Sequence, residues 1–459
     1  MVNKGYFAQC EPVELEQMLA ARERRAQTQR QLLERYGAPI ICLTLNIPGA
    51  YKLYPLARRA FDEGCRVVFA RLGKLPAVHK SQNIDLTGCE GYFCVDAAPQ
   101  QLKTLMMSIE DHHPLGRLFD IDVIDQSGPV KGASLGRPQR ECLICAGPVW
   151  QCTRSRTHPP EQLAMRTAKL IDEFFVGKLA DDVCKTAVRA LLYEVSITPK
   201  PGLVDRANTG AHRDMDFFTF LDSGCALIAY FREITLKAIR FEGQAGELLP
   251  SLRFLGLCAE DEMLAATGGV NTHKGLVFSL GIVCAAVGYL YGKGCEVLPG
   301  SLFETCAKIA AGALSELESK GEQVTYGQAA YAGSGLTGAR GQAAAGFPAV
   351  RDVGYPALER YISRGCSLET AGATALLHLM ANVDDTNIHG RAGEERLRRV
   401  KARVKLLLQD TQDPQRLLDA AQELDRDFAE QNLSPGGSAD LLAVSLMVYW
   451  ILQPGFFGD

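Results

Sequence analysis

The chain has 459 residues, of which 47% are hydrophobic and 22% charged, and its formal net charge is −4. This length exceeds that of one ordinary domain, so two domains are expected. The slightly acidic balance argues against a general nucleic-acid-binding surface, and an anionic ligand must therefore be held by local Lys and Arg side chains and by helix ends.

Residues 1–158 predict a small domain that mixes helices with strands. A charged helix over residues 11–36 ends at Gly37, because glycine commonly follows the last turn of a helix. The mixture that follows is typical of an α/β or α+β fold. Strands are predicted at residues 39–46, 66–69, 92–95 and 118–124, and further helices at about 53–63 and 99–109.

Residues 162–459 predict a larger, all-helical domain. Strand patterns largely disappear after about residue 161, and the Pro/Arg-rich stretch 146–160 marks the boundary. Long Ala/Leu-rich segments follow, separated by loops rich in glycine and proline. Helices are predicted at residues 162–195, 216–238, 246–266, 274–292, 301–318, 368–381, 394–408, 413–430 and 437–452.

Two uncharged segments, Gly275–Gly292 and Leu441–Gly458, are long enough to be mistaken for membrane spans. Glycines and a serine in the first and Pro454 in the second favour buried helices instead. The first residues lack the apolar run of a secretory signal. Most of the fifteen cysteines lie inside apolar runs, as reduced core thiols do, so we expect a cytoplasmic protein.

A D-x-D pair marks a candidate metal site in the first domain. On a strand, Asp120 and Asp122 share one face while Phe119, Ile121 and Val123 share the other. Adjacent carboxylates repel unless a cation lies between them, and Mg²⁺ commonly binds one or two carboxylates together with substrate phosphates. The alternative is an exposed edge strand with solvated aspartates.

A cysteine- and arginine-rich stretch ends the first domain. Cys142, Cys145, Cys152 and His158 have the spacing of zinc ligands, and unliganded thiols beside a basic linker are the alternative. Arginines interleaved with them suit phosphate recognition. An earlier turn, N-I-P-G at 46–49 followed by Lys52, could approach a ligand or be an ordinary turn.

The loop at residues 198–214, T-P-K-P-G-L-V-D-R-A-N-T-G-A-H-R-D, is dense in titratable side chains and constrains the function more than any other stretch. Its prolines stiffen the backbone and its glycines permit tight turns. A stiff loop of this kind between apolar helices suits a catalytic or polyanion site. The alternative is a polar connection. The candidate residues here are Lys200, Asp205, His212 and Asp214.

Four more motifs of the second domain could contribute to a site. In T-G-G-V-N-T-H-K-G at 267–275, the glycine-rich turn enters a helix whose amides could hold phosphates. G-A-R-G at 338–341 predicts a mobile lid that carries Arg340. Asp384 and Asp385 end an apolar helix, where negative charge is unfavourable without a cation. S-P-G-G-S-A-D at 434–440 could be only a helix start.

Together these motifs are more specific than any one of them. The second domain resembles the triphosphoribosyl-dephospho-CoA synthase family. The matching segments extend over most of residues 162–455: E-V-S-I-T-P-K-P-G-L-V-D-R-A-N-T-G-A-H-R-D-M, T-G-G-V-N-T-H-K-G, G-A-R-G-Q-A-A-A-G-F-P, D-D-T-N-I and S-P-G-G-S-A-D-L-L.

The first domain resembles the citrate lyase holo-acyl-carrier-protein synthase, a phosphoribosyl-dephospho-CoA transferase. The matching segments are N-I-P-G with Lys52, G-R-L-F-D-I-D-V and G-R-P-Q-R-E-C-L-I-C…C-T-R-S-R-T-H. The two resemblances imply a bifunctional maturation enzyme. ATP and 3′-dephospho-CoA would give triphosphoribosyl-dephospho-CoA and adenine, and the product would be attached to a serine of the citrate lyase acyl carrier protein, with release of diphosphate.

The resemblance also implies roles for residues. Magnesium would be held by Asp120 and Asp122 in one domain and by Asp384 and Asp385 in the other. Acid–base work falls to Glu194, Asp205, His212 and Asp214, with no assignment among them. The remaining candidates bind substrate or phosphate: Lys52, Arg117, Arg137, Arg140, Lys200, Asn271, His273, Lys274, Arg340 and Ser434.

Three alternatives stay open. The malonate decarboxylase pathway uses the same intermediate. A helical nucleotide hydrolase would release ribose triphosphate rather than a coupled product. Residues 1–160 could be a zinc-stabilised docking module for the carrier protein rather than an enzyme.

Overall fold

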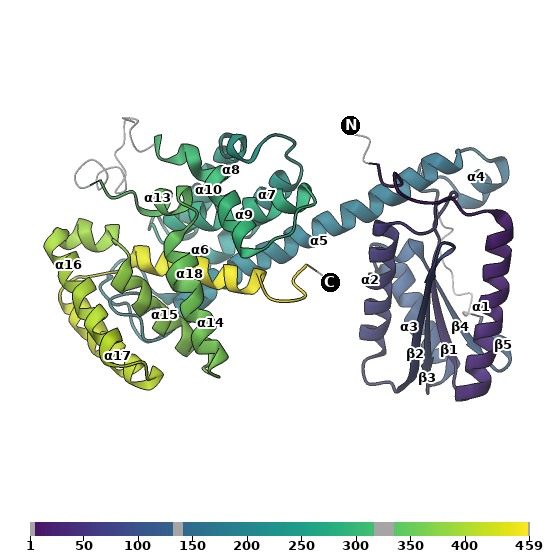
Figure 1. The fold of residues 1–459 in the computed structure, drawn as a ribbon, viewed down its shortest axis with the longest axis horizontal. Coiled ribbons are helices and arrows are strands. Elements are labelled where there is room, and N and C mark those ends of the chain that lie inside the picture. The colour runs from purple at the N-terminus through teal and green to yellow at the C-terminus, as the bar shows by residue number, and fades with distance from the viewer. Residues whose placement is uncertain (1–4, 132–140, 316–334, 458–459) are drawn as a thin grey trace. The chain divides into compact units, whose positions relative to one another are not determined.

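The computed structural model describes residues 5–131, 141–315 and 335–457, and the chain divides into two compact units, Met1–Phe175 and Val176–Asp459 (Figure 1). Arg137 and Arg140 lie outside the described residues. The first unit mixes helices with a sheet and the second is helical, as the sequence predicted.

The first unit is built on one five-stranded antiparallel sheet in the order β2-β3-β1-β4-β5. Its core forms where α2 and α3 pack on one face of the sheet, with residues of α5 added. A smaller apolar cluster lies on the opposite face of the sheet, which packs against α1 (Figure 1). The elements are α1 (Leu15–Tyr36), β1 (Ile40–Leu45), α2 (Pro55–Leu72), β2 (Ala77–Asp85), β3 (Gly88–Val95), α3 (Pro99–His112), the 3₁₀ turn η1 (Gly116–Leu118), β4 (Phe119–Asp125), β5 (Gly128–Pro129), α4 (Val149–Ser155) and α5 (Pro160–Ser196).

One prediction in this unit was wrong, and two elements, strand β2 and helix α4, were not predicted. Residues 66–69 continue helix α2 instead of forming a strand, because Phe61, Cys65, Val68 and Leu72 recur at helical spacing and bury one face. Strand β2 was missed, since most of its side chains are exposed and it carries no apolar alternation.

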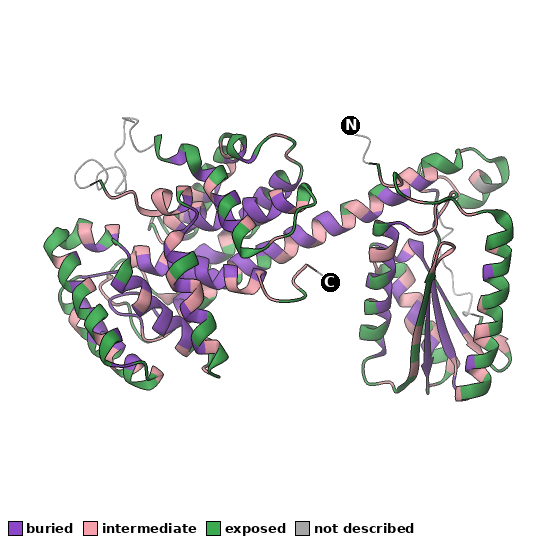
Figure 2. Ribbon diagram, viewed as in Figure 1, coloured by how far each residue is buried: buried purple, intermediate pink, exposed green. Residues whose placement is uncertain are grey.

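The second unit has one large apolar core surrounded by helices (Figure 2). Its helices are α6 (Phe217–Ala226), α7 (Ile228–Ile239), α8 (Leu248–Ala266), α9 (Lys274–Gly292), α10 (Pro299–Ala310), α13 (Gly338–Ala344), α14 (Tyr355–Ser363), α15 (Leu368–Asn382), α16 (Thr386–Asp410), α17 (Pro414–Glu430) and α18 (Gly436–Ile451), with short turns η2 (Ala245–Glu247), η3 (Ala311–Ala313) and η4 (Val350–Gly354).

Helix α9 is apolar and long enough to cross a membrane, yet 72% of its apolar window is buried inside the unit. It contacts α7, α10 and α18, which explains its lack of charge without a bilayer. Helix α18 is likewise largely buried. The sequence expectation that these two segments are core helices is confirmed for the residues described.

Four details differ from the sequence expectation. The helix predicted at 301–318 ends at Ala310, after which the 3₁₀ turn η3 begins. The helix predicted at 216–238 is two helices that meet at Leu227. Helix α14 was missed. The G-A-R-G segment, expected in a mobile lid, forms the first residues of α13.

Candidate active site

The second unit contains a cavity of about 1160 Å³, a size suited to small-molecule and cofactor ligands. Its walls come from segments that are far apart in the sequence, from the end of α5 to the start of α18. It gathers eleven residues that the sequence had singled out: Glu194, Lys200, His212, Asp214, Asn271, His273, Lys274, Arg340, Asp384, Asp385 and Ser434.

The 198–214 loop is fixed by its glycines and by buried carboxylates. Gly202 has a φ of 69°, and a Cβ there would overlap the carbonyl oxygen of Leu433, so only glycine fits this position. Asp425 of α17 accepts hydrogen bonds from Gly202 N (2.9 Å) and Asn208 Nδ2 (2.8 Å). These contacts hold the loop against the end of α17.

Asp205 orders the same loop from within. Its carboxylate accepts from the backbone N–H groups of Lys200 (3.2 Å), Ala207 (2.7 Å) and Asn208 (3.1 Å). The side chain is buried and is not among the residues that line the cavity. Asp205 was predicted as an acid–base candidate, and these contacts favour a role in positioning Lys200 instead.

A buried ion pair lies in the wall of the cavity. Lys200 Nζ donates to Glu194 Oε1 at 2.5 Å, and both side chains are almost fully buried. Burial raises the pKa of Glu194, and the Lys200 charge opposes that rise. Since the ammonium group already has a carboxylate partner, its predicted contact with phosphate stays a prediction.

His212 and Ser434 both line the cavity and lie within hydrogen-bond distance of each other. The Nε2 of His212 lies 2.9 Å from Ser434 Oγ, and its Nδ1 lies 3.5 Å from an Arg391 guanidinium nitrogen and 3.8 Å from Asp214 Oδ1. Burial, followed by the Arg391 charge, lowers the pKa of His212. The imidazole is therefore neutral at pH 7 and able to take up a proton.

His273 precedes α9 and is fully enclosed. Thr272 Oγ1 donates to Ser223 Oγ (2.7 Å), which lies 2.6 Å from His273 Nδ1. Since the Ser223 hydroxyl accepts from Thr272, its own O–H can donate a hydrogen bond to Nδ1, and Nε2 then carries the ring hydrogen. This Nε2 is buried and has no hydrogen-bond partner among the described residues. Because His273 lines the cavity, its Nε2–H is a candidate donor to a ligand.

The turn before α9 is glycine-rich and leads into the helix, and its contact with phosphate stays a prediction. Gly268 and Gly269 have φ values of 65° and 91°, which favour glycine. Asn271 Oδ1 accepts from Lys274 N at 3.2 Å, and Lys274 Nζ pairs with Glu260 Oε2 at 2.7 Å. Lys274 and the neighbouring helix start thus face the cavity.

The magnesium site predicted at Asp384 and Asp385 does not fit the contacts. Asp385 Oδ1 accepts from Asn387 N and Ile388 N, and its Oδ2 accepts from the Ser438 N–H and hydroxyl. Asp385 is thus the N-cap of α16 and ties it to α18. Asp384 pairs with Lys401 Nζ at 2.5 Å. The sequence argument placed both at a helix end, whereas Asp385 begins the next helix, where a carboxylate is favourable.

One acidic residue of the cavity was missed. Asp440 lies in α18, and a Cβ on Gly275 would overlap its Oδ2, so glycine at the start of α9 makes room for this carboxylate. Burial raises the pKa of Asp440 well above its usual value, and the charges of Glu194 and Asp385 add to the rise. Asp440 is the last residue of the S-P-G-G-S-A-D motif. It was not predicted as a site residue because the motif could be explained as a helix start.

The charges of the cavity walls bear on metal binding. Seven carboxylate side chains line it, against the four cationic side chains Lys200, Lys274, Arg340 and Arg391. A triphosphate would therefore need an accompanying cation. Among the described residues, no three acidic or histidine ligand atoms of the cavity converge on one point.

In the first unit, Asp120 and Asp122 lie side by side on β4, as predicted. Both face the α1 side of the sheet, where they are in register with Thr44 and Cys42 of β1. Partial burial raises the pKa of Asp122, and the adjacent Asp120 charge contributes. Two neighbouring carboxylates of this kind fit the one or two that Mg²⁺ commonly binds.

The charges of Lys103 and Arg25 oppose the rise in the pKa of Asp122, and two further cationic residues, Lys52 and Arg117, belong to loops of the same sheet. Arg25 of α1 donates to Glu90 Oε1 (2.7 Å) beside the same face. Arg117 immediately precedes β4, and Asn46 N donates to Leu118 O (2.8 Å), which joins the N-I-P-G turn to the Arg117 turn. Lys52 Nζ donates to Ile47 O (2.5 Å), and burial lowers its pKa. Lys52, Arg117 and Asp120 thus lie toward one end of the sheet.

The cysteine-rich stretch also converges. One ligand atom from each of Cys142, Cys145, Cys152 and His158 lies within 4.8 Å of the others.

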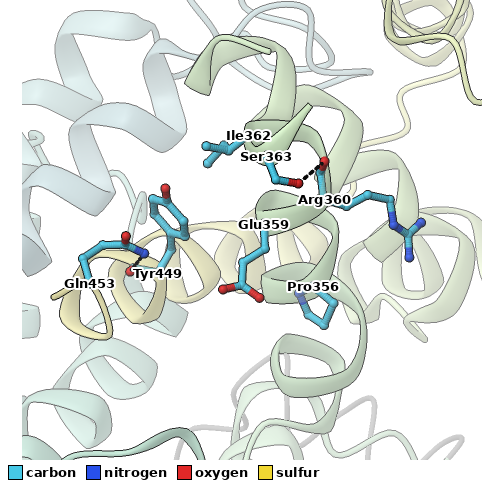
Figure 3. A pocket seen from close by; sticks show the side chains of 7 residues that line it. All are labelled: Pro356, Glu359, Arg360, Ile362, Ser363, Tyr449 and Gln453. Atoms are coloured by element: carbon cyan, nitrogen blue, oxygen red, sulfur yellow. Dashed lines mark hydrogen bonds between the residues drawn. The ribbon is translucent and has the colours of Figure 1, made fainter. Parts of the chain in front are cut away.

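A second pocket in the second unit, of about 560 Å³, lies between α14 and the end of α18 and is lined by Glu359, Arg360 and Tyr449, among others (Figure 3). It contains none of the residues that the sequence had singled out.

The second unit thus holds a large cavity between helices, and the first holds two neighbouring aspartates on a sheet, an arrangement that fits an enzyme with two separate units. Residues 180–455 match the family described as ATP:dephospho-CoA triphosphoribosyl transferase, and residues 13–174 match apo-citrate lyase phosphoribosyl-dephospho-CoA transferase. The chain belongs to the family in which these two transferases are fused, and it is a transferase with both activities.

Relatives of the whole chain and of its second part support this assignment. "Protein CitXG" of Haemophilus influenzae is 33% identical over 450 residues, which is 95% of each chain. "Protein CitXG" of Leuconostoc mesenteroides subsp. cremoris is 31% identical over 96% of this chain and 98% of its own. The 2-(5''-triphosphoribosyl)-3'-dephosphocoenzyme-A synthase of Pectobacterium atrosepticum is 42% identical over 58% of this chain and 88% of its own.

Proposed function

We propose that the chain makes the citrate lyase prosthetic group in its second unit and attaches it in its first. The observation that carries the first half is the cavity, which gathers eleven predicted residues from segments between Glu194 and Ser434. In the second unit the 2′-hydroxyl of dephospho-CoA attacks C1′ of the ATP ribose. The new C1′–O bond forms, the C1′–N9 bond breaks, the hydroxyl loses a proton and adenine gains one.

Asp440 is proposed as the acid that protonates adenine. Its carboxyl group lines the cavity and has the raised pKa that an acid needs at neutral pH. The build-up of positive charge on the ribose suits walls rich in carboxylates, as in glycoside hydrolysis. Neutral His212 is proposed as the base for the hydroxyl, with Ser434 orienting the ring.

Phosphate binding is proposed for Lys274 and Arg340, which lie on the cavity wall at the starts of α9 and α13. The Nε2–H group of His273 would add a neutral hydrogen-bond donor. A neutral donor is sufficient if Mg²⁺ bound to the triphosphate already offsets much of its charge. That cation would offset the triphosphate charge, and we assign it no ligand among Asp384 and Asp385.

The first unit is proposed to transfer the product to the citrate lyase acyl carrier protein. The carrier serine hydroxyl loses its proton as its oxygen attacks the phosphate next to the ribose. A phosphodiester bond forms, the P–O bond to the outer two phosphates breaks, and diphosphate leaves. Asp120 and Asp122 would hold Mg²⁺, which lowers the charge on the attacked phosphate. Arg117 would stabilise the leaving diphosphate, and Arg137 and Arg140 are proposed to do the same.

Mass spectrometry tests both halves. The chain is incubated with ATP, dephospho-CoA and Mg²⁺, and adenine and triphosphoribosyl-dephospho-CoA are expected in equal amounts. Adenine with free ribose triphosphate would mean a hydrolase instead. Apo carrier proteins of citrate lyase and of malonate decarboxylase are then added separately. The mass increase is expected on the citrate lyase carrier, and labelling of the malonate carrier alone would reverse the choice of pathway.

A further inference from the structure

Residues 141–159, which precede α5, bring four potential metal ligands together. Cys142, Cys145, Cys152 and His158 each present one ligand atom, and all four lie within 4.8 Å of one another. The Sγ atoms of Cys145 and Cys152 are 3.4 Å apart. With Zn–S bonds of about 2.3 Å, two sulfurs of a tetrahedral site lie about 3.8 Å apart, which is close to this spacing.

Local hydrogen bonds produce this arrangement. Cys142 N donates to Gly147 O (2.6 Å) and Ala146 N donates to Cys142 O (3.1 Å), so the C-x2-C segment forms a tight turn. Ile144 N lies 3.5 Å from Cys142 Sγ, as a donor to a thiolate would. Helix α4 then places Cys152 beside Cys145. Arg156 ends that helix with a positive φ of 48°, which turns the chain toward His158.

The histidine provides an independent observation. The Nε2 atom of His158 is buried, and no described residue forms a hydrogen bond with it. A buried ring nitrogen without a partner is costly unless something absent from the polypeptide binds it. Cysteines alone could pack as thiols, but the converging imidazole is better explained by a metal ion.

We propose that these four residues bind one structural Zn²⁺ in a tetrahedral Cys₃His site. Thiolate and imidazole ligands favour zinc over Mg²⁺ or Ca²⁺. Four protein ligands close the coordination sphere, so the ion holds the segment before α5 in place and takes no part in the transfer reaction. The proposal is separate from the function of either unit and does not depend on it.

The test uses the full-length chain, purified without chelators from cells grown with zinc. Elemental analysis by mass spectrometry is expected to give one zinc per chain. Cys152→Ser and His158→Gln are each expected to reduce the zinc content at least tenfold. Cys295→Ser, which alters an exposed cysteine of the second unit, is the matched control and should retain one zinc.

A second measurement covers variants that fail to fold. The wild-type chain is exchanged with Co²⁺, and a tetrahedral spectrum with thiolate-to-cobalt charge transfer is expected. A metal-free protein whose intact mass shows a Cys145–Cys152 disulfide would overturn the proposal. So would an octahedral cobalt spectrum, or zinc that persists in both ligand variants.

Discussion

Lys200 Nζ and Glu194 Oε1 form a 2.5 Å ion pair whose side chains are 1% and 3% exposed. Removing only one partner would leave a buried charge without compensation, which typically costs about 3–5 kcal/mol. Lys200→Met should therefore lower the free energy of unfolding of the second unit by about that amount. Chemical denaturation measures this loss of stability, and hydrogen exchange in α9 reports on the second unit in particular.

The double variant Glu194→Leu/Lys200→Met is the control for this prediction. It removes both charges at once, so most of the lost stability should return. Adenine release should stay absent, because the cavity wall has lost two polar groups. A double variant as unstable as Lys200→Met would mean that packing around Lys200, rather than the unpaired charge, causes the loss.

Gly275 and Asp440 provide a test of carboxylate position. The Cβ of Gly275→Ala would overlap Asp440 Oδ2, which is the end of a side chain and can swing away. The fold should therefore tolerate the change while adenine release falls at least tenfold. Gly256→Ala in α8 is the matched control, since its Cβ would meet nothing within 4 Å. It should retain activity and gain up to about 1 kcal/mol of stability.

If Gly275→Ala retains full adenine release, the position of Asp440 is irrelevant to catalysis. If it unfolds the second unit, then the contact is structural. Circular dichroism melts of both glycine variants separate these results from a selective loss of activity.

Asp440→Asn tests the proposed acid directly. Adenine release should fall about 10²–10⁴-fold, the usual contribution of a general acid. The wild-type rate should fall as pH rises through the raised pKa of Asp440, since only the protonated form donates, and this limb should vanish in the variant. Asp261→Asn, at an exposed position in α8, should behave as wild type.

The response of Asp440→Asn to Mg²⁺ distinguishes a role of Asp440 as an acid from a role as a metal ligand. If Asp440 were a metal ligand, excess Mg²⁺ would restore the rate of the Asn variant. Such recovery would contradict the assignment as an acid. Steady-state rates measured across a range of Mg²⁺ concentrations provide the comparison.

Stability should fall at acid pH because of His273. Burial, with the Lys200 charge, lowers its folded pKa from 6.5 to about 3. The unfolded chain therefore binds more protons between these values, and stability is lost as pH falls below 6.5. Between pH 6.5 and 5 the loss is about 1.6 kcal/mol, because the slope rises from about 0.7 to about 1.4 kcal/mol per pH unit as the unfolded histidine becomes protonated.

The variant His273→Gln should lack this part of the pH dependence, so its stability gap from wild type should narrow by about that amount at pH 5. Denaturant titrations at both pH values measure the gap. His112→Gln, at an exposed position of the first unit, should leave the pH dependence of the second unit unchanged. A constant gap for His273→Gln would show that His273 is not buried as described.

The sequence was sufficient for features that depend on local pattern. Helical periodicity predicted α9, α15 and α18, and residue density pointed to the 198–214 loop. The sequence could not show which acidic side chains are already held by hydrogen bonds, because their partners are distant in the chain. Asp385 accepts hydrogen bonds from Ser438, fifty-three positions away, whereas the Asp440 carboxylate lies against Gly275 of α9. Strand β2 was invisible for a related reason, since β3 fixes its pairing while its own side chains are mostly exposed.

Asp122→Asn tests whether the two reactions use separate sites. Asp122 lies on β4 of the first unit, and the nucleotide cavity is lined by residues of the second. Labelling of the carrier should therefore fall at least a hundredfold while adenine release keeps its wild-type rate, since removing one carboxylate weakens only the Mg²⁺ site of the sheet. Intact-mass analysis of the carrier and adenine quantification in the same reaction measure both. Glu23→Gln, at an exposed position on α1, should leave both rates unchanged. Parallel loss of adenine release in Asp122→Asn would show that the sheet contributes to the first reaction, and normal labelling would remove Asp122 from the transfer site.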